Sequence, residues 1–207
     1  MYSIDVGPID ICCLDFSPDD NVFACGSNSG KITFHDVESG KLKNSLMNEA
    51  IFIMSIAFSP DGNSVASGTM GGIITTFDVA TGKMLHAMQS HTMAIRSLCF
   101  SPDSKLLVSG SDDGKVKLHD IKSAQHFCTL NGHGSWVSGV DFAPNNEILA
   151  SSSCDNSVRM WELKNKKCLH TFKEHNDQVW SVKFNPDGDK MMSVSEDRAI
   201  NIYDCSA

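Results

Sequence analysis

Residues 100–103 read Phe-Ser-Pro-Asp, and this phrase or a near variant occurs five times in the chain. The copies begin at positions 16, 58, 100, 142 and 184, so each lies 42 residues after the one before it. An acidic residue that ends a short, mostly β-branched run has the same period: Asp36, Asp78, Asp120, Glu162 and Asp204. The chain therefore repeats one structural unit five times without an insertion or deletion.

Each unit divides into four short runs that are typical of β-strands. In the third unit, these runs cover residues 95–100, 106–109, 115–120 and 125–130, separated by stretches rich in Pro, Asp, Ser and Gly that favour turns. A repeat of about 40 residues with four strands is typical of a β-propeller, with one blade per repeat. We therefore predict an all-β propeller forming one domain over residues 1–207, with five four-stranded blades at residues 7–48, 49–90, 91–132, 133–174 and 175–207.

The first residues are out of phase with these blades. Tyr2 to Asp5 aligns by the 42-residue period with Asn44 to Met47, the predicted fourth strand of the first blade, whereas the last blade ends after its third strand. We expect residues 1–6 to form an outer strand of a neighbouring or closing blade, because such pairing would remove an exposed strand edge.

The composition excludes several classes of ligand. The formal net charge is −8, and the 17 lysines and arginines are scattered, so no basic surface for nucleic acid is expected. No apolar run is long enough to cross a membrane, and the first residues lack the basic and apolar segments of a signal peptide. We expect a soluble protein that binds neither nucleic acid nor membrane.

The cysteines and histidines do not form the motifs of a metal site. The chain has eight cysteines but no Cys-x-x-Cys, and most of the cysteines lie in predicted strands, where a free thiol behaves as a small apolar residue. The eight histidines are dispersed over different repeats, so we expect no metal and no cofactor. Free thiols favour a reducing compartment, and we expect the nucleus and cytoplasm.

A histidine, a serine and an aspartate recur in register in the last three repeats. A hydrolase uses such a set once, but a structural bond is needed in every blade, so the repetition favours a structural role. The residues are His91, Ser109 and Asp113, then His133, Ser151 and Asp155, then His175, Ser193 and Asp197.

The repeat resembles the WD-repeat family, in which Gly-His precedes the first strand, Ser or Thr lies in the second, Asp in the next turn, and Trp-Asp ends the third strand. This resemblance implies that the three recurring residues form a buried network with a tryptophan, and the fourth repeat holds the full set with Trp161. In the first two repeats, Gly7 and Glu49 stand at the His position, and Ser29 and Gly71 stand at the Asp position. The two partners are absent together, as expected if either alone would leave a buried polar group unpaired at a cost of about 1–3 kcal/mol.

The resemblance also implies where partners bind: at one position inside the first strand, one two residues earlier, and one just before the turn aspartate. Two of the three tryptophans and an arginine fall at these positions, and both residue types are enriched in interface hot spots. The alternative is that the two tryptophans only pack between blades. The expected partner-binding residues are Phe52, Met54, Met70, Arg96, Trp136, Gln178 and Trp180.

Stretches outside the repeat pattern resemble one group of WD-repeat proteins more closely. Residues 132–144 (GHGSWVSGVDFAP) and 201–205 (NIYDC) are similar to the WD-repeat subunits of the superkiller complex and the polymerase-associated-factor (PAF) complex. Those subunits are seven-bladed, so we expect a fragment of a seven-bladed protein, with an open five-blade arc or a closed five-blade ring as alternatives.

The resemblance implies a non-enzymatic scaffold that joins protein subunits in mRNA decay and in transcription elongation, with no small-molecule substrate. Another WD-repeat adaptor, such as a ubiquitin-ligase substrate receptor or a histone-tail reader, is the first alternative. A propeller enzyme is the second, but it would need unrepeated polar residues, and nearly every candidate here is repeated or dispersed.

Overall fold

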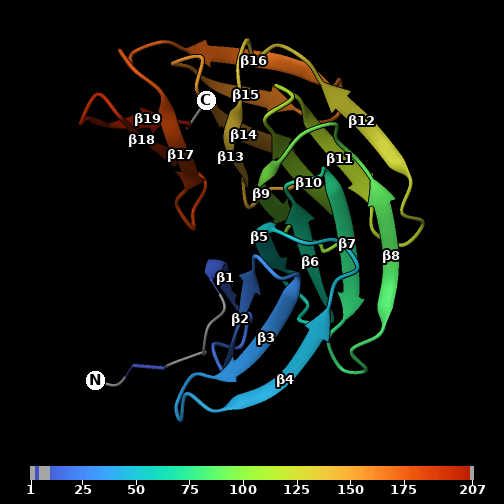
Figure 1. Cartoon of the computed structure of the whole chain (residues 1–207). Coiled ribbons are helices and arrows are strands. Elements are labelled where there is room, and N and C mark those ends of the chain that lie inside the picture. Colours follow the sequence, from blue (N-terminus) through green and yellow to red (C-terminus); the bar gives the residue numbers. More distant parts are fainter. Residues whose placement is uncertain (1–2, 5–9, 206–207) are drawn as a thin grey trace. The chain divides into compact units, whose positions relative to one another are not determined.

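The computed structural model describes residues 3–4 and 10–205 (Figure 1). This part of the chain contains 19 β-strands and no helix, which confirms the all-β prediction. It therefore contains no helix long and apolar enough to span a membrane. Ser3 and Ile4 belong to no strand, and the rest of the strand predicted over residues 1–6 lies outside the described residues.

The strands form five antiparallel sheets in chain order, here numbered 1 to 5. Sheet 1 contains β1 (Ile11–Phe16), β2 (Val22–Ser27), β3 (Lys31–Asp36) and β4 (Leu42–Met47), and sheet 2 contains β5 (Ile53–Phe58), β6 (Ser64–Thr69), β7 (Ile73–Asp78) and β8 (Met84–Gln89). Sheet 3 contains β9 (Ile95–Phe100), β10 (Leu106–Ser111), β11 (Val116–Asp120) and β12 (His126–Leu130). Sheet 4 contains β13 (Val137–Phe142), β14 (Ile148–Ser153), β15 (Val158–Glu162) and β16 (Lys167–Phe172), and sheet 5 contains β17 (Val179–Phe184), β18 (Lys190–Ser195) and β19 (Ile200–Asp204).

The repeated phrase forms the turn between the first two strands of a sheet. In the third repeat, the Ser101 amide donates to the carbonyl of Leu106 at 2.8 Å, and the Leu106 amide donates to the Ser101 hydroxyl at 2.9 Å. The Ser101 hydroxyl also donates to Asp103 at 2.7 Å. The phenylalanine that begins the phrase, Phe100, is buried in the core. The phrase thus combines one core side chain with a self-bonded turn.

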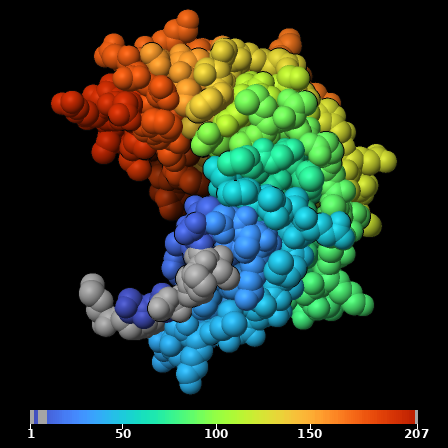
Figure 2. All heavy atoms as spheres, viewed as in Figure 1, coloured from blue at the N-terminus to red at the C-terminus, as the bar shows by residue number. Residues whose placement is uncertain are grey.

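The chain divides into two compact units, Met1–Ile95 and Arg96–Ala207. In the first unit, apolar side chains of sheet 1 pack on sheet 2 in one core cluster, and in the second unit sheet 3 packs on sheet 4 and sheet 4 on sheet 5. Within each unit, segments that follow one another in the sequence, and therefore have similar colours in Figure 2, lie next to one another on the surface. The single domain and the propeller arrangement of the blades stay predictions.

All eight cysteines are free thiols, of which Cys12 is exposed and the others are buried or half-buried. Burial raises the pKa of Cys13 to about 12 and that of Cys99 to about 11, so both are neutral near neutral pH. These two thiols therefore act as small packing groups.

Candidate functional site

The fourth repeat brings its histidine, serine, aspartate and tryptophan together. His133 precedes β13, Ser151 lies in β14, Asp155 lies in the following turn and Trp161 lies in β15. His133 Nδ1 lies 3.0 Å from Asp155 Oδ2, and His133 Nε2 lies 2.7 Å from Ser151 Oγ. The indole N–H of Trp161 donates to Ser151 Oγ at 2.8 Å. Because the carboxylate only accepts, Nδ1 is the donor, and the chain of bonds runs from the indole through the hydroxyl and the ring to the carboxylate.

The fifth repeat has the same arrangement with a tyrosine in place of the tryptophan. His175 Nδ1 lies 2.9 Å from Asp197 Oδ2, and His175 Nε2 lies 2.7 Å from Ser193 Oγ. The Tyr203 hydroxyl lies 3.1 Å from Ser193 Oγ. In each of these two repeats, the serine of the second strand is thus hydrogen-bonded to the aromatic side chain near the end of the third strand.

The boundary between the two compact units lies inside the third repeat, so the recurring residues of this repeat belong to different units. His91 lies in the first unit and is buried. In the second unit, Ser109 is fully buried and donates to the carbonyl of Lys117 at 3.3 Å, while Asp113 accepts from the Lys115 amide at 3.1 Å.

A nucleophilic role does not fit these serines. A catalytic serine must reach a substrate carbonyl, but Ser151 and Ser193 are buried. The Ser151 hydroxyl already accepts from the Trp161 indole. The arrangement holds the loop before the first strand, the second strand and the next turn together, which is a structural task.

Sequence reasoning missed the polar centre of sheet 2. Asn48 is buried, its side-chain amide donates to Ser67 Oγ at 3.0 Å, and its carbonyl oxygen accepts from Thr75 Oγ1 at 3.0 Å. Ser67 corresponds to Ser151 by the period, so Asn48 takes the place of a histidine. Asn48 lies one residue before Glu49, which is the position that corresponds to the histidine by the 42-residue period. The period alone therefore does not identify Asn48.

The first repeat has no counterpart of this network among its described residues. Cys25 occupies the serine position, and exposed Ser29 lies at the aspartate position with its hydroxyl 3.0 Å from that of Ser27. Gly7, at the histidine position, lies outside the described residues.

Hydrogen bonding keeps both turn aspartates ionised. Burial opposes the charge of Asp155, but hydrogen bonds from His133, Ser157 and the Gly134 amide outweigh it and lower the pKa well below its usual value. For Asp197, the Asn176 amide lowers the pKa most, burial partly opposes it, and His175 lowers it further, so the pKa falls from 3.8 to about 2.

These lowered pKa values predict an acid-dependent loss of stability. A carboxyl whose pKa is lower in the folded state stabilises the fold fully above its unfolded pKa and loses this contribution as the pH falls to the folded pKa. For Asp197, this window extends from pH 3.8 down to about 2. We expect the urea midpoint of Asp197→Asn to fall less between these pH values than that of the wild type. Asp187→Asn, at an exposed carboxyl, is the control, and equal pH slopes for wild type and Asp197→Asn would contradict the prediction.

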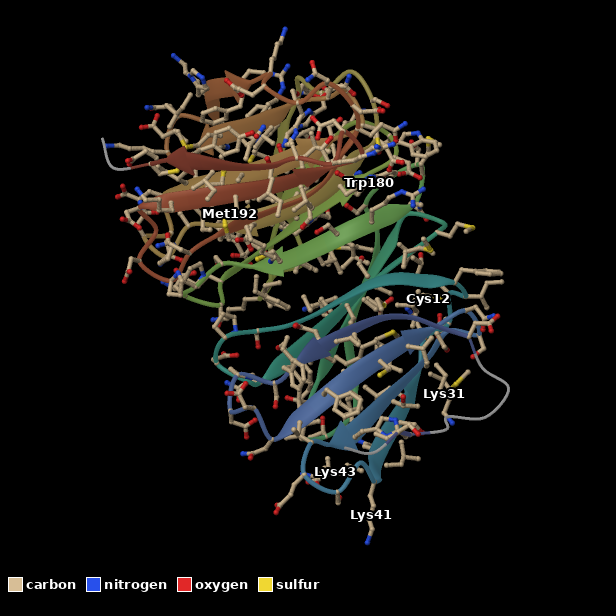
Figure 3. All side chains as sticks on the ribbon, turned by 90° about the vertical axis from the view of Figure 1, so that its left-hand side faces the viewer. Cys12, Lys31, Lys41, Lys43, Trp180 and Met192 are labelled. Atoms are coloured by element: carbon tan, nitrogen blue, oxygen red, sulfur yellow. The ribbon has the colours of Figure 1, made fainter. Side chains whose placement is uncertain are left out.

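The predicted partner-binding positions of the second unit form two polar–aromatic groups. Arg96 donates to both carboxylate oxygens of Asp112, at 2.6 and 2.9 Å, and its guanidinium lies 5.0 Å from the centre of the Trp136 ring. We call these three residues the Arg96 cluster. Trp180, which is labelled in Figure 3, donates from its indole nitrogen to Glu196 at 2.9 Å, and we call these two residues the Trp180 pair.

Both tryptophans are presented to solvent. Trp136 is 44% exposed and Trp180 is 46% exposed, which is more than packing between blades predicts for such large side chains. Their surroundings are ordered by backbone bonds: the Cys154 amide donates to the carbonyl of Trp136, and the Glu196 amide to that of half-buried Gln178, both at 2.9 Å. The three position classes inferred from the sequence therefore meet within the fifth repeat, at Trp180, Gln178 and Glu196, whereas the Arg96 cluster joins the third repeat to the fourth.

In the first unit, Phe52 and Met70 are exposed and Met54 is half-buried. The Met70 amide donates to the carbonyl of Phe52, and the Phe52 amide donates to the carbonyl of Asn28, both at 2.9 Å. Phe52 has a φ of +57°, a conformation that bulky residues rarely adopt. The two backbone bonds hold the backbone of Phe52 in this strained conformation.

No group of three or more His, Cys, Asp or Glu side chains that could hold a metal ion is present among the described residues.

Comparison with known families gives five matches to one family model. The model, described as "WD domain, G-beta repeat", matches residues 6–36, 40–78, 82–120, 124–162 and 166–204. Each of the last four matches starts just before the outer strand of one sheet and ends with the third strand of the next, so sequence repeat and sheet are offset by one strand. No curated protein matches the chain.

Proposed function

Because the chain belongs to the WD-repeat family, we propose that it is a non-enzymatic scaffold that binds partner proteins through the Arg96 cluster and the Trp180 pair. WD repeats themselves indicate protein–protein interaction. The observation that carries the choice of surface is that two large, nearly half-exposed indoles are each held by a charged neighbour.

The geometry of these groups suits binding. Exposed tryptophan and arginine side chains contribute strongly when a partner removes them from water. Arg96 is already fixed by two bonds to Asp112, and Trp180 by one bond to Glu196, so little side-chain freedom is lost on association. The Trp136 face beneath the guanidinium adds a cation–π contact that desolvation strengthens.

The test is a pull-down with the full chain carrying Trp180→Ala and Arg96→Glu. Loss of the anchors should weaken retention of at least one partner by about 10-fold or more. The matched control is Leu169→Ala, which changes an exposed apolar residue outside both groups. If the double variant has an unchanged melting curve and still retains every partner at wild-type levels, this surface is not the binding site.

We further propose that the partners are subunits of the superkiller and PAF complexes, and that the chain works in both the nucleus and the cytoplasm. This proposal rests on the resemblance of residues 132–144 and 201–205 to WD repeat-containing protein 61. The Arg96 cluster includes Trp136 from the first of these stretches, which connects the resemblance to the exposed surface.

Affinity purification of the chain from its own cells, with mass spectrometry of the bound proteins, tests this assignment. We expect subunits of the superkiller complex from the cytoplasmic fraction and subunits of the PAF complex from the nuclear fraction. Recovery of ubiquitin-ligase subunits or histones in their place would instead support another WD-repeat adaptor.

A further inference from the structure

The chain contains one Asn-Gly dipeptide, Asn131–Gly132. It lies between the end of β12 and the start of β13, so it connects sheet 3 to sheet 4 within the second compact unit. Asparagine is a chemically labile residue, and a following glycine makes it more so, because glycine has no side chain to block the approach of its backbone nitrogen. Both residues are exposed, so the dipeptide is open to water.

Neither of the two groups that would react is held by a hydrogen bond. Among the described residues, the Asn131 side chain has no hydrogen-bonding partner and the Gly132 amide has no acceptor. At the equivalent position of the first repeat, the Asn48 amide donates to the carbonyl of Gly30 at 2.9 Å. The second repeat has the same bond from the Ser90 amide, at 3.0 Å. The third repeat therefore leaves free a backbone nitrogen that the first two repeats hold.

The guanidinium of Arg159 lies against the backbone of Gly132. A methyl group on the Gly132 Cα atom would overlap Arg159 Nη1 and lie 3.0 Å from Cζ, so the contact requires a glycine. The guanidinium also lies 5.8 Å from the centre of the Trp161 ring, and Nη1 lies 3.9 Å from Cys168 Sγ. In the part of the chain that the structure describes, no carboxylate pairs with Arg159, and its buried Nε has no hydrogen-bonding partner. A positive charge without an acidic partner thus lies beside the dipeptide.

We propose that Asn131 is a site of spontaneous deamidation and that the Arg159 guanidinium promotes the reaction. The Gly132 backbone nitrogen loses its proton and attacks Cγ of Asn131, so that a C–N bond forms and the Cγ–Nδ2 bond breaks. The departing nitrogen takes up a proton and leaves as ammonia. Water then opens the cyclic imide at one of its two carbonyls, which gives aspartate or isoaspartate. The reaction consumes one water molecule and needs no oxidant, reductant or enzyme.

The place of Arg159 suits both charged steps. Removal of the amide proton leaves a negative charge on the Gly132 nitrogen, and the attack leaves a negative charge on the side-chain oxygen of Asn131. A nearby positive charge stabilises both, and more strongly where water is partly excluded. Arg159 is half-buried between Gly132 and Trp161. The folded chain therefore favours this reaction more than an unfolded Asn-Gly segment would.

The products change the loop that leads into the fourth network. Aspartate adds a negative charge beside Arg159, and isoaspartate also lengthens the backbone by one carbon just before the glycine that precedes His133. His133 in turn bonds to Asp155 and Ser151. With age, the chain should therefore acquire two modified forms that differ from the original in this loop.

The test follows deamidation of the full chain during incubation at mildly alkaline pH, with mass spectrometry of peptides to locate each site. Asn63 is the internal control, because it is also exposed and precedes a small residue. Its side chain donates to Asp61 at 3.0 Å, and the next amide, that of Ser64, donates to Ser59 Oγ at 2.9 Å. Asn131 should convert at least about 10-fold faster than Asn63, to a mixture of aspartate and isoaspartate. Equal rates at the two sites would overturn the proposal.

The Arg159→Gln variant tests the role of the guanidinium, at a temperature at which circular dichroism shows the chain to be folded. This change should slow the conversion of Asn131 by about 3-fold or more in the folded chain. In concentrated urea, which separates the two residues, variant and wild type should convert at the same rate. Arg198→Gln removes the same charge from an exposed turn of sheet 5 and should leave the rate unchanged. If Arg159→Gln converts as fast as the wild type when folded, or is slowed equally in urea, Arg159 does not promote the reaction.

Discussion

Replacement of Trp161 with alanine is expected to lower the free energy of unfolding by about 3–5 kcal/mol. The indole is almost fully buried in the core cluster between sheets 3 and 4, so its removal leaves a large cavity. Its N–H is also the donor to Ser151 Oγ, so one acceptor loses its partner. For a chain of this length, the loss corresponds to a melting temperature lower by roughly 6–20 °C, which calorimetry or circular dichroism can measure.

The chain offers two matched controls for this prediction. Trp161→Phe retains a ring at a position where sheet 2 has the buried Phe77, so it should cost only the hydrogen bond and a smaller cavity, about 1–2 kcal/mol. Trp180→Ala removes an indole of the same size from an exposed site and should change stability by less than about 0.5 kcal/mol. If Trp161→Ala and Trp180→Ala melted at the same temperature, Trp161 would not have the role assigned here.

Asp155→Ala is expected to destabilise the fold by about 1–3 kcal/mol, because it leaves His133 Nδ1 and the Gly134 amide without their acceptor. Ser29→Ala, at the corresponding position of the first repeat, should be nearly neutral. Ser29 is exposed, and the serine of the network is replaced there by Cys25. Denaturant midpoints of the two variants measured at the same pH provide the comparison.

The difference between the two variants is the informative quantity. Both change the same repeat position, so equal destabilisation would mean that the position itself, and not the histidine–aspartate pair, controls stability. A double variant, His133→Ala with Asp155→Ala, should cost less than the sum of the single variants, because the two residues interact directly.

Much of the fold could be predicted from the period of the sequence. In the third repeat, the predicted runs 95–100, 106–109, 115–120 and 125–130 correspond to strands 95–100, 106–111, 116–120 and 126–130. The agreement has a local cause, since each turn is closed by its own residues: Ser101 bonds across the first turn, and Gly114 has a φ of +76° in the second. Strand bounds were less well predicted: β10 extends two residues past its predicted end because its pairing with β11 continues to Gly110, whereas β11 and β12 each begin one residue later than predicted.

The site could be predicted only in part, because side-chain partners depend on three-dimensional geometry. The period places Arg96 and Asp112 in different classes of position, and only the structure shows that they form a two-bond ion pair across a hairpin. Asn48 was missed because its side chain reaches the network from one residue earlier than a histidine would. Periodicity also makes Leu14 equivalent to Ile56, so it cannot show that one is exposed and the other buried.

The central claim is that the Arg96 cluster and the Trp180 pair bind protein partners while the buried networks hold the fold. Hydroxyl-radical footprinting of the full chain, free and bound to its purified partners, tests this most directly because it reports the solvent exposure of individual side chains. We predict that oxidation of Trp136 and Trp180 falls several-fold in the complex, while that of Phe127, which is equally exposed outside both groups, stays unchanged. Equal oxidation of both tryptophans in the free chain and in an intact complex would contradict the claim.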